Sequence, residues 1–267
     1  MKIGVFDSGV GGLTVLRELL AAIPEADYFY LGDTARLPYG SKSATTIARY
    51  AVSSVQLLQD YGAECLVIAC NTASALAMEQ IRTAARTEVW GVIVPGARAA
   101  SAITHNRNVC VIGTAATVAS HAYRKELEKL GIQAVEKACP LFVPLVEEGW
   151  VDHPVTEQVA RIYLDELAQE QQAKNGSSAD VLVLGCTHYP LLKPLLHRVL
   201  PDGMQLVDSA QATAQNVRKN LSVKKSSFPH ASQVRFFATD SVEKFRLLGS
   251  RFLGRPIDKV ELVRLPE

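Results

Sequence analysis

The sequence has almost no net charge, and it lacks a cationic run, a long apolar run and an apolar leader. Its 28 basic and 27 acidic residues leave a net charge of +1, and no run of Lys or Arg is longer than a pair. The basic stripe with which proteins bind nucleic acid is therefore missing. No segment approaches the ~18 consecutive apolar residues of a membrane-spanning helix, and the opening residues lack the apolar region of a secretory signal. We expect no nucleic acid and no membrane as partners, and a cytoplasmic location.

Cysteine is also scarce, and its spacing argues against two common structural uses. The five cysteines are an odd number and include no Cys-x-x-Cys pair, so a disulfide framework is not expected. Each cysteine is then either a small core residue or a reactive group. Cys65, Cys110 and Cys139 lie in apolar runs or beside a proline, which predicts a place in the core.

Short apolar runs alternate with segments of helical period along the whole chain. Apolar residues recur at helical spacing in residues 13–23, 47–58 and 155–163, and this alternation predicts an α/β fold with mainly parallel sheets. The polar segments 169–178 and 222–232 are expected to be loops. The apolar runs that are typical of buried parallel strands are residues 3–6, 28–31, 65–69, 89–94, 109–112, 134–138, 181–184, 204–207, 234–238 and 260–263.

A weak internal repeat divides the chain into two related halves. IGVFDS from Ile3 opens one half and VCVIGT from Val109 opens the other, and each is followed by an apolar strand that ends in a cysteine, CLVIACNTAS and VLVLGCTHYP. Ligands in open α/β sheets bind outside the carboxyl ends of the strands. Two such units that face each other across a cleft would bring Cys70 and Cys186 together.

Cys70 and Cys186 differ from the other cysteines because polar, turn-forming residues follow them. Each lies at a predicted junction from strand to helix, where oriented N–H groups lower a thiol pKa and favour the reactive thiolate. His188, two residues after Cys186, is suited to acid–base work near neutral pH. Asp7, at the end of the first predicted strand, either caps a helix or carries or orients a proton beside a thiol. Cys186-x-His188 alternatively resembles half a zinc site, but no second pair with ligand spacing exists, so no metal is expected.

Several short clusters of neutral hydrogen-bond donors follow the predicted strands. The run after Asp7, SGVGG, matches neither the dinucleotide nor the Walker pattern of glycines. The turn at residues 38–40 offers backbone N–H groups to a carboxylate, and Thr114 and Thr117 add hydroxyls at a helix start. Any one cluster alone would be read as a helix cap, but together beside two cysteines they suit a small dicarboxylate.

The motifs DSGVGG, DTARLPYG, CNTAS, PLFVPLVE and GCTHYP, in this order, resemble those of the glutamate racemase family. The resemblance runs from about residue 2 to residue 208 and implies two pseudo-symmetric α/β domains with the active site in the cleft between them. The first domain would comprise residues 1–96 and 209–267, and the second residues 97–208. The resemblance also implies that no cofactor, neither pyridoxal phosphate nor a nucleotide, takes part. It implies a bacterial cytoplasm as well, because the family supplies D-glutamate for peptidoglycan.

The resemblance further implies a role for each site residue. Cys70 and Cys186 would be the two acid–base thiols, which act on D- and L-glutamate respectively, with Asp7 and the pair Glu147–His188 as their helpers. The chain has Ala116 where a glycine is expected in GTAATV, which would tighten the turn that holds Thr117, and Glu148 is a second candidate for the helper carboxylate. The substrate pocket would be lined by Ser8, Pro38, Tyr39, Gly40, Asn71, Thr72, Thr114, Thr117 and Thr187.

Other functions remain open at this point. A racemase for aspartate or another amino acid would differ only in the length of its pocket, and a non-catalytic binding protein for a small ligand would need neither cysteine. Cysteine peptidase chemistry is poorly supported because His188 is too close in sequence to Cys186 to be its usual partner. The sequence leaves the oligomeric state open, with a homodimer as one arrangement.

Overall fold

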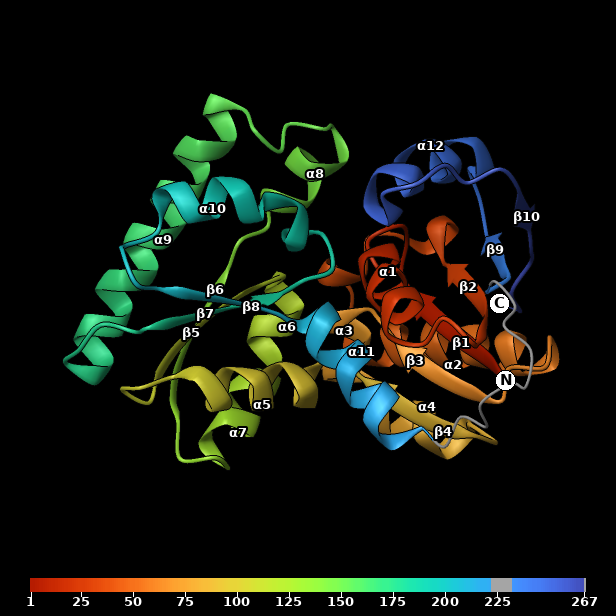
Figure 1. The fold of residues 1–267 in the computed structure, drawn as a ribbon, viewed down its shortest axis with the longest axis horizontal. Coiled ribbons are helices and arrows are strands. Elements are labelled where there is room, and N and C mark those ends of the chain that lie inside the picture. Colours follow the sequence, from red (N-terminus) through yellow and green to blue (C-terminus); the bar gives the residue numbers. More distant parts are fainter. Residues whose placement is uncertain (222–231, 267) are drawn as a thin grey trace.

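The computed structural model describes residues 1–221 and 232–266, in which ten strands form two parallel sheets (Figure 1). All neighbouring strands are parallel. The six-stranded sheet, in the order β10-β9-β2-β1-β3-β4, comprises β1 (Lys2–Asp7), β2 (Asp27–Gly32), β3 (Cys65–Ile68), β4 (Glu88–Gly91), β9 (Val234–Ala238) and β10 (Val260–Leu262). The four-stranded sheet, in the order β6-β5-β7-β8, comprises β5 (Asn108–Gly113), β6 (Gln133–Ala138), β7 (Val181–Gly185) and β8 (Gln205–Asp208).

The two sheets repeat one strand order. The strands β2-β1-β3-β4 of the first sheet correspond in order and direction to β6-β5-β7-β8 of the second, so the weak internal repeat in the sequence is a repeat of topology. In chain order, the third strand of each repeat is β3 in the first sheet and β7 in the second, and Cys70 and Cys186 follow these two strands. Because parallel strands end at the same edge of their sheet, each cysteine lies beside the end of β1 or β5.

Twelve helices flank the sheets in the described residues, and Figure 1 shows α11 between the two halves, where it packs against α1 and α5. The helices are α1 (Leu13–Ala22), α2 (Ala44–Asp60), α3 (Asn71–Leu76), α4 (Met78–Ala84), α5 (Ile93–Ile103), α6 (Ala115–Ser120), α7 (Ala122–Glu128), α8 (Phe142–Glu147), α9 (Pro154–Asn175), α10 (Lys193–Val199), α11 (Ser209–Asn220) and α12 (Val242–Leu253).

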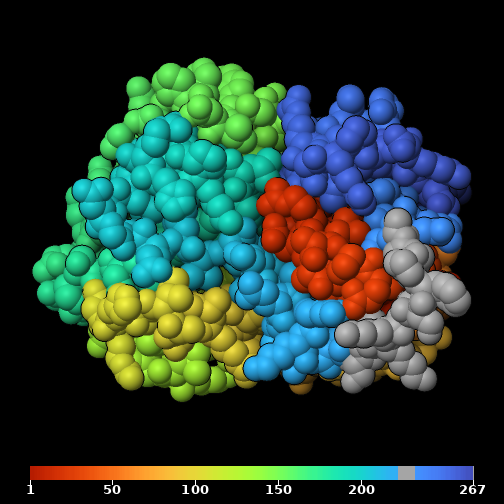
Figure 2. Space-filling view, viewed as in Figure 1, coloured from red at the N-terminus to blue at the C-terminus, as the bar shows by residue number. Residues whose placement is uncertain are grey.

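The hydrophobic core joins the halves. Successive residues of a strand point to opposite faces of its sheet, so Val5 of β1 lies in the larger apolar cluster and Phe6 in a smaller one beneath α2. The larger cluster also contains Val183 of β7 in the other sheet. The space-filling view shows the two halves in contact (Figure 2). Packing therefore fixes how the two sets of strand ends face each other. Cys65, Cys110 and Cys139 are buried in the larger cluster, as predicted.

Each of the ten predicted strands is present, and two predicted boundaries are wrong. Residues 92–94 were expected to extend a strand, but β4 ends at Gly91 and α5 begins at Ile93, because an apolar run alone does not distinguish a strand from a buried helix. Residues 169–178 were expected to be a loop, but α9 continues to Asn175 and ends at Gly176, whose φ is +67°. Gln, Glu, Ala and Lys favour helix, and glycine suits the left-handed residue after it.

The second predicted loop, at residues 222–232, lies outside the described residues apart from its last position. The domain division at residues 97 and 209 stays a proposal. In its support, β1–β4, β9 and β10 come from the segments assigned to the first domain, and β5–β8 from the second. Helix α5 runs across residue 97, so the two halves are connected there by a helix instead of an irregular linker.

Candidate active site

The ends of β1, β3 and β7 bring three ionisable groups of the predicted site into one region. Asp7 is the last residue of β1, Cys70 is the residue before α3, and Cys186 directly follows β7. Backbone N–H groups of Ala69 and Cys70 donate to the carbonyl of Phe6, at 2.8 and 3.4 Å, which holds the Cys70 turn beside Asp7. Cys70 and Cys186 are each 5% exposed and Asp7 is 1% exposed.

The Asp7 carboxylate connects the two cysteine-bearing turns. Its Oδ1 accepts a hydrogen bond from Gly9 N at 2.9 Å, and its Oδ2 accepts one from Thr187 Oγ1 at 3.4 Å. Burial raises the pKa of Asp7 above its ordinary value, while His188 and the backbone N–H groups oppose that rise. The same carboxylate acts on Cys70, whose pKa it helps to raise. One side chain thus reaches the surroundings of both thiols.

The Cys186 turn is pressed directly against the loop after β1. Thr14 Oγ1 donates to the carbonyl of Thr187 at 3.0 Å, across the two halves. A Cβ atom at Gly11 would lie 2.5 Å from Nδ1 of His188, a separation that real Cβ atoms do not adopt. A glycine is required at position 11 because the two halves approach so closely here.

Replacing Gly11 by Ala should therefore displace Thr187 and His188 and lower the catalytic rate of this site at least tenfold, since small shifts at a reacting centre are costly (~10²-fold for about 1 Å). Gly9→Ala is the matched variant, because its Cβ would meet only the flexible end of Leu37, at 3.2 Å. We expect a smaller loss for it. Turnover by the two variants at equal folded concentration checks this, and equal turnover would contradict it.

The surroundings of Cys70 correct one expectation from the sequence. Burial, helped by Asp7, raises the pKa of the Cys70 thiol to about 12, although N–H groups at the start of α3 and the Ser8 hydroxyl lower it. A lowered pKa was expected from the helix start, but α3 has only six residues and desolvation outweighs its N–H groups. Cys70 is therefore a protonated thiol here, and its Sγ lies 3.6 Å from Ser8 Oγ.

Cys186 has a different set of neighbours, which form a relay to a carboxylate. His188 Nδ1 lies 3.9 Å from Cys186 Sγ, and His188 Nε2 lies 3.2 Å from Glu147 Oε1 at the end of α8. Lys244 Nζ lies 3.9 Å from the other oxygen of Glu147, and the ring of Phe252 packs edge-on against the imidazole at 5.0 Å. Glu147, and not its exposed neighbour Glu148, makes this contact with His188.

Within this relay, His188 and Glu147 each favour the charged form of the other. Burial alone would lower the pKa of His188, but Cys186 and Glu147 outweigh it and raise that pKa above its ordinary value. The hydrogen bond from His188 in turn lowers the pKa of Glu147, against a smaller effect of burial. His188 is therefore an imidazolium at neutral pH, held between a carboxylate and a thiol.

Three predicted hydroxyl donors form a cluster that spans the halves. Thr72 Oγ1, at the start of α3, lies 2.9 Å from Thr114 Oγ1 and 3.2 Å from Thr117 Oγ1, and the last two are 2.9 Å apart. Thr114 caps α6 by accepting a hydrogen bond from Thr117 N. Thr117 is buried despite Ala116, so the turn places both hydroxyls in the cluster.

The predicted carboxylate-binding turn reaches the same cluster. Pro38 follows a cis peptide bond, and the Tyr39 hydroxyl donates to Asp33 Oδ2. A Cβ atom at Gly40 would lie 3.1 Å from Cβ of Thr114. The turn at residues 38–40 therefore packs directly on Thr114, as a site built from both halves requires.

Asn71 lies beside Cys70 and has one unused hydrogen-bonding group. Its Oδ1 accepts from the hydroxyl of Tyr123 at 2.7 Å, while its buried Nδ2 has no hydrogen-bond partner. A buried donor without a partner costs free energy (~1–3 kcal/mol) and marks a place where a ligand would accept a hydrogen bond. Tyr123 and Lys244 were not predicted from the sequence, because neither lies in a motif.

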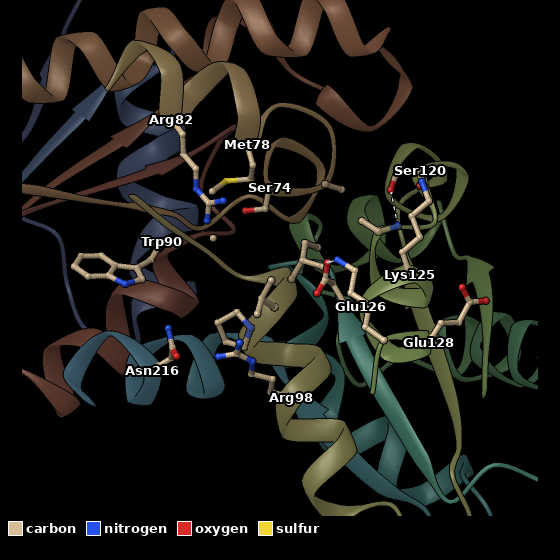
Figure 3. Close-up of a pocket in the computed structure, with 17 residues that line it drawn as sticks. Ser74, Met78, Arg82, Trp90, Arg98, Ser120, Lys125, Glu126, Glu128 and Asn216 are labelled. Atoms are coloured by element: carbon tan, nitrogen blue, oxygen red, sulfur yellow. Dashed lines mark hydrogen bonds and ion pairs between the residues drawn. The ribbon is translucent and has the colours of Figure 1, made fainter. Parts of the chain in front are cut away.

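A cavity between the two halves lies apart from the predicted site (Figure 3). It has a volume of about 800 Å³ and is lined by residues of α3, α4, β4, α5, α6, α7 and α11, including Trp90, Arg82 and Arg98. None of the predicted site residues lines it. Ser120, at the end of α6, and Lys125 of α7 form one wall (Figure 3), where Lys125 Nζ donates to the carbonyl of Ser120 at 3.0 Å. A small cavity of about 90 Å³ instead borders Glu147 and Lys244.

The sequence also allowed Cys186 and His188 to be read as half a zinc site. Within residues 1–221 and 232–266, no group of three or more His, Cys, Asp or Glu is suited to a metal ion. Among the same residues, no helix combines the length and apolar character needed to cross a bilayer.

Comparison with known proteins adds a family to this geometry. The family model for Asp/Glu/Hydantoin racemases matches residues 3–217. A glutamate racemase of Koribacter versatilis is 54% identical over 98% of this chain and 97% of its own length. The crystal structure of glutamate racemase isoform RacE1 from Bacillus anthracis matches with a TM-score of 0.90 and 35% identity, over 99% of this chain and 97% of that one. That of Francisella tularensis glutamate racemase in complex with D-glutamate matches with a TM-score of 0.86 and 34% identity, over 98% and 97% of the two chains.

Proposed function

The chain belongs to the Asp/Glu/hydantoin racemase family, in which it is a glutamate racemase, and we propose that Cys70 and Cys186 move the α-proton of its substrate. It interconverts L- and D-glutamate. The observation that carries the two-thiol proposal is that two topologically equivalent strand ends each present a buried cysteine, with Asp7 in contact with the surroundings of both.

The symmetry of the reaction asks for a base on each face of the α-carbon. Racemisation removes the α-proton from one face and returns a proton to the other, and the product is the substrate of the reverse reaction. One base for each face therefore serves both directions. Two related halves of one chain, each with a cysteine after its third strand, support this proposal, because each half would supply the base for one face.

The two thiols have different roles at the start of a turnover. We assign Cys186 the role of base for L-glutamate because its Sγ lies 3.9 Å from Nδ1 of the His188 imidazolium, whereas Cys70 has no such cation beside it and keeps its proton. In this state Cys186 takes the α-proton from L-glutamate, and Cys70 gives its proton to the opposite face to yield D-glutamate. That step leaves the proton on Cys186 and removes it from Cys70. In this second state Cys70, helped by Asp7, takes the α-proton of D-glutamate.

Carbanion stabilisation falls to hydrogen-bond donors, because in our proposal no cofactor accepts the electrons. Fixed donors in a dry site stabilise developing charge more strongly than water does. The free Nδ2 of Asn71 is one such donor. The others that we propose to hold the two carboxylates and the amino group are Ser8, the turn of Pro38, Tyr39 and Gly40, and the hydroxyls of Thr72, Thr114, Thr117 and Thr187.

Mass spectrometry of the two isomers, separated on a chiral column after reaction in D₂O, tests the two-base route, and circular dichroism of L-glutamate incubated with the protein in D₂O tests the activity. We expect the signal to decay to zero, with deuterium appearing in newly formed D-glutamate before it appears in the remaining L-glutamate, since each base exchanges its proton on its own face. L- and D-aspartate are the matched substrates, and we expect much slower conversion of both. Faster conversion of aspartate than of glutamate would mean that aspartate is the substrate. A dichroism signal that stays constant with glutamate and with aspartate would refute racemisation.

We further propose that the enzyme works in the cytoplasm, supplies D-glutamate for peptidoglycan, and forms a homodimer. The small-molecule substrate agrees with the relatives crystallised with glutamate. Light scattering of the purified protein measures the oligomeric state, and a monomer mass would exclude the dimer.

A further inference from the structure

Tyr123, which no motif marked, contacts the neighbours of both cysteines. It lies on α7 of the second half and is fully buried. Its hydroxyl donates to Oδ1 of Asn71, the residue after Cys70, at 2.7 Å. A Cβ atom at Gly185, the residue before Cys186, would lie 3.1 Å from Cε2 of the same ring.

The ring is held in place from a third side. A Cβ atom at Gly96, in the helix α5 that connects the halves, would lie 3.1 Å from Cε1 of Tyr123 and 3.2 Å from its hydroxyl. The ring is thus enclosed by the backbones of Gly96 and Gly185, and neither glycine can carry a side chain without displacing it. A ring confined in this way holds its hydroxyl at a fixed place relative to β7.

The hydroxyl in turn determines how the Asn71 amide points. Because Tyr123 occupies Oδ1, the other end of the amide, Nδ2, is left buried and without a partner on the residue that follows Cys70. Without the phenol, the amide could rotate and present its oxygen, which would repel a substrate carboxylate instead of binding it. The neutral phenol persists at working pH, because burial raises the pKa of Tyr123 above its ordinary value.

We propose that Tyr123 is a positioning residue that fixes the Asn71 amide beside Cys70 relative to the strand end that carries Cys186. It acts through Asn71 and touches no substrate. The inference rests on the proposed function, in that Asn71 binds substrate and the two cysteines exchange the proton.

A double-mutant cycle with Tyr123→Phe and Asn71→Ala tests this role. Tyr123→Phe keeps the enclosed ring, and we expect it to lower kcat about five- to tenfold in both directions, the effect of losing one neutral hydrogen bond, with a smaller change in KM. In the Asn71→Ala background the same change should lower kcat no further, because the residue that it positions is gone. A purely structural role would instead multiply the two losses.

Tyr28→Phe is the matched control. Tyr28 is also buried, and its hydroxyl lies within hydrogen-bond distance of the carbonyls of Leu19 and Ile23, at 2.9 and 2.8 Å, and contacts no residue of the proposed site. We expect it to lower the melting temperature and keep kcat. Wild-type kcat in Tyr123→Phe, or losses that multiply with those of Asn71→Ala, would overturn the inference and leave the two-thiol proposal intact. If the Cys70 and Cys186 variants were fully active, the two-thiol proposal would fail whatever the cycle shows.

Discussion

Replacing Cys70 or Cys186 by Ser is expected to slow the racemisation of glutamate by about 10²–10⁴-fold, the range that general acid–base catalysis contributes. A serine hydroxyl fills nearly the same space as a thiol, but it is a far weaker acid and takes up no negative charge near neutral pH. The loss should be similar in both directions, because each turnover uses one thiol as base and the other as acid.

The two variants should differ in the isomer that still exchanges with solvent. In D₂O, Cys70→Ser keeps the thiol that takes the proton of L-glutamate, so we expect deuterium to enter L-glutamate without inversion. Cys186→Ser should label D-glutamate in the same way. Proton NMR of the α-position measures both.

Cys110→Ser provides the matched control for this pair. Cys110 lies in the core, with its Sγ 3.9 Å from Oε1 of Gln171, a polar neighbour that a hydroxyl also tolerates. We expect wild-type racemisation from it. Wild-type rates in both Cys70→Ser and Cys186→Ser would end the two-thiol proposal, and labelling of the same isomer by both would reject the assignment of faces.

The fold was largely predictable because buried parallel strands leave a local trace. Runs such as Val181–Gly185 are apolar throughout, since both faces of the strand are covered. A polar residue after such a run signals a strand end, so the positions of Asp7, Cys70 and Cys186 followed from the sequence alone. The predicted repeat of these runs likewise appears as a repeated strand order.

Contacts between distant segments left no such trace. The hydrogen bond from Tyr123 to Asn71 joins residues 52 positions apart, and no local pattern distinguishes this tyrosine from an ordinary core residue. The pKa of Cys70 was misjudged for a related reason. The helix start that lowers it is visible in the sequence, but the burial that raises it depends on how the halves pack. Continuation of α9 to Asn175 also reflects packing, since the polar Gln171 is buried and bonds Asn108.

Replacing Glu147 by Gln is expected to move the alkaline limit of activity on L-glutamate towards neutral pH. His188 has a raised pKa because Cys186 and Glu147 outweigh its burial. Without the carboxylate, burial prevails more strongly, the pKa of His188 falls, and the imidazolium beside Cys186 is lost at a lower pH. Activity should drop about tenfold for each unit by which the pH exceeds the new value. Below the new alkaline limit His188 is protonated in both proteins, so the Glu147 carboxylate should change the activity little there. It loses its charge only when the pH falls to its own lowered pKa.

The dependence of kcat/KM on pH for L-glutamate measures this shift, with Glu148→Gln as the matched control. Glu148 is exposed and follows Glu147 directly, so its replacement removes the same charge one residue away from the relay. We expect the Glu148 variant to keep the wild-type profile. The same shift in both variants would mean that the loss of one negative charge in this region, and not the contact of Glu147 with His188, sets the alkaline limit. An unchanged profile in Glu147→Gln would contradict the prediction and would mean that Cys186 alone keeps the His188 imidazolium protonated.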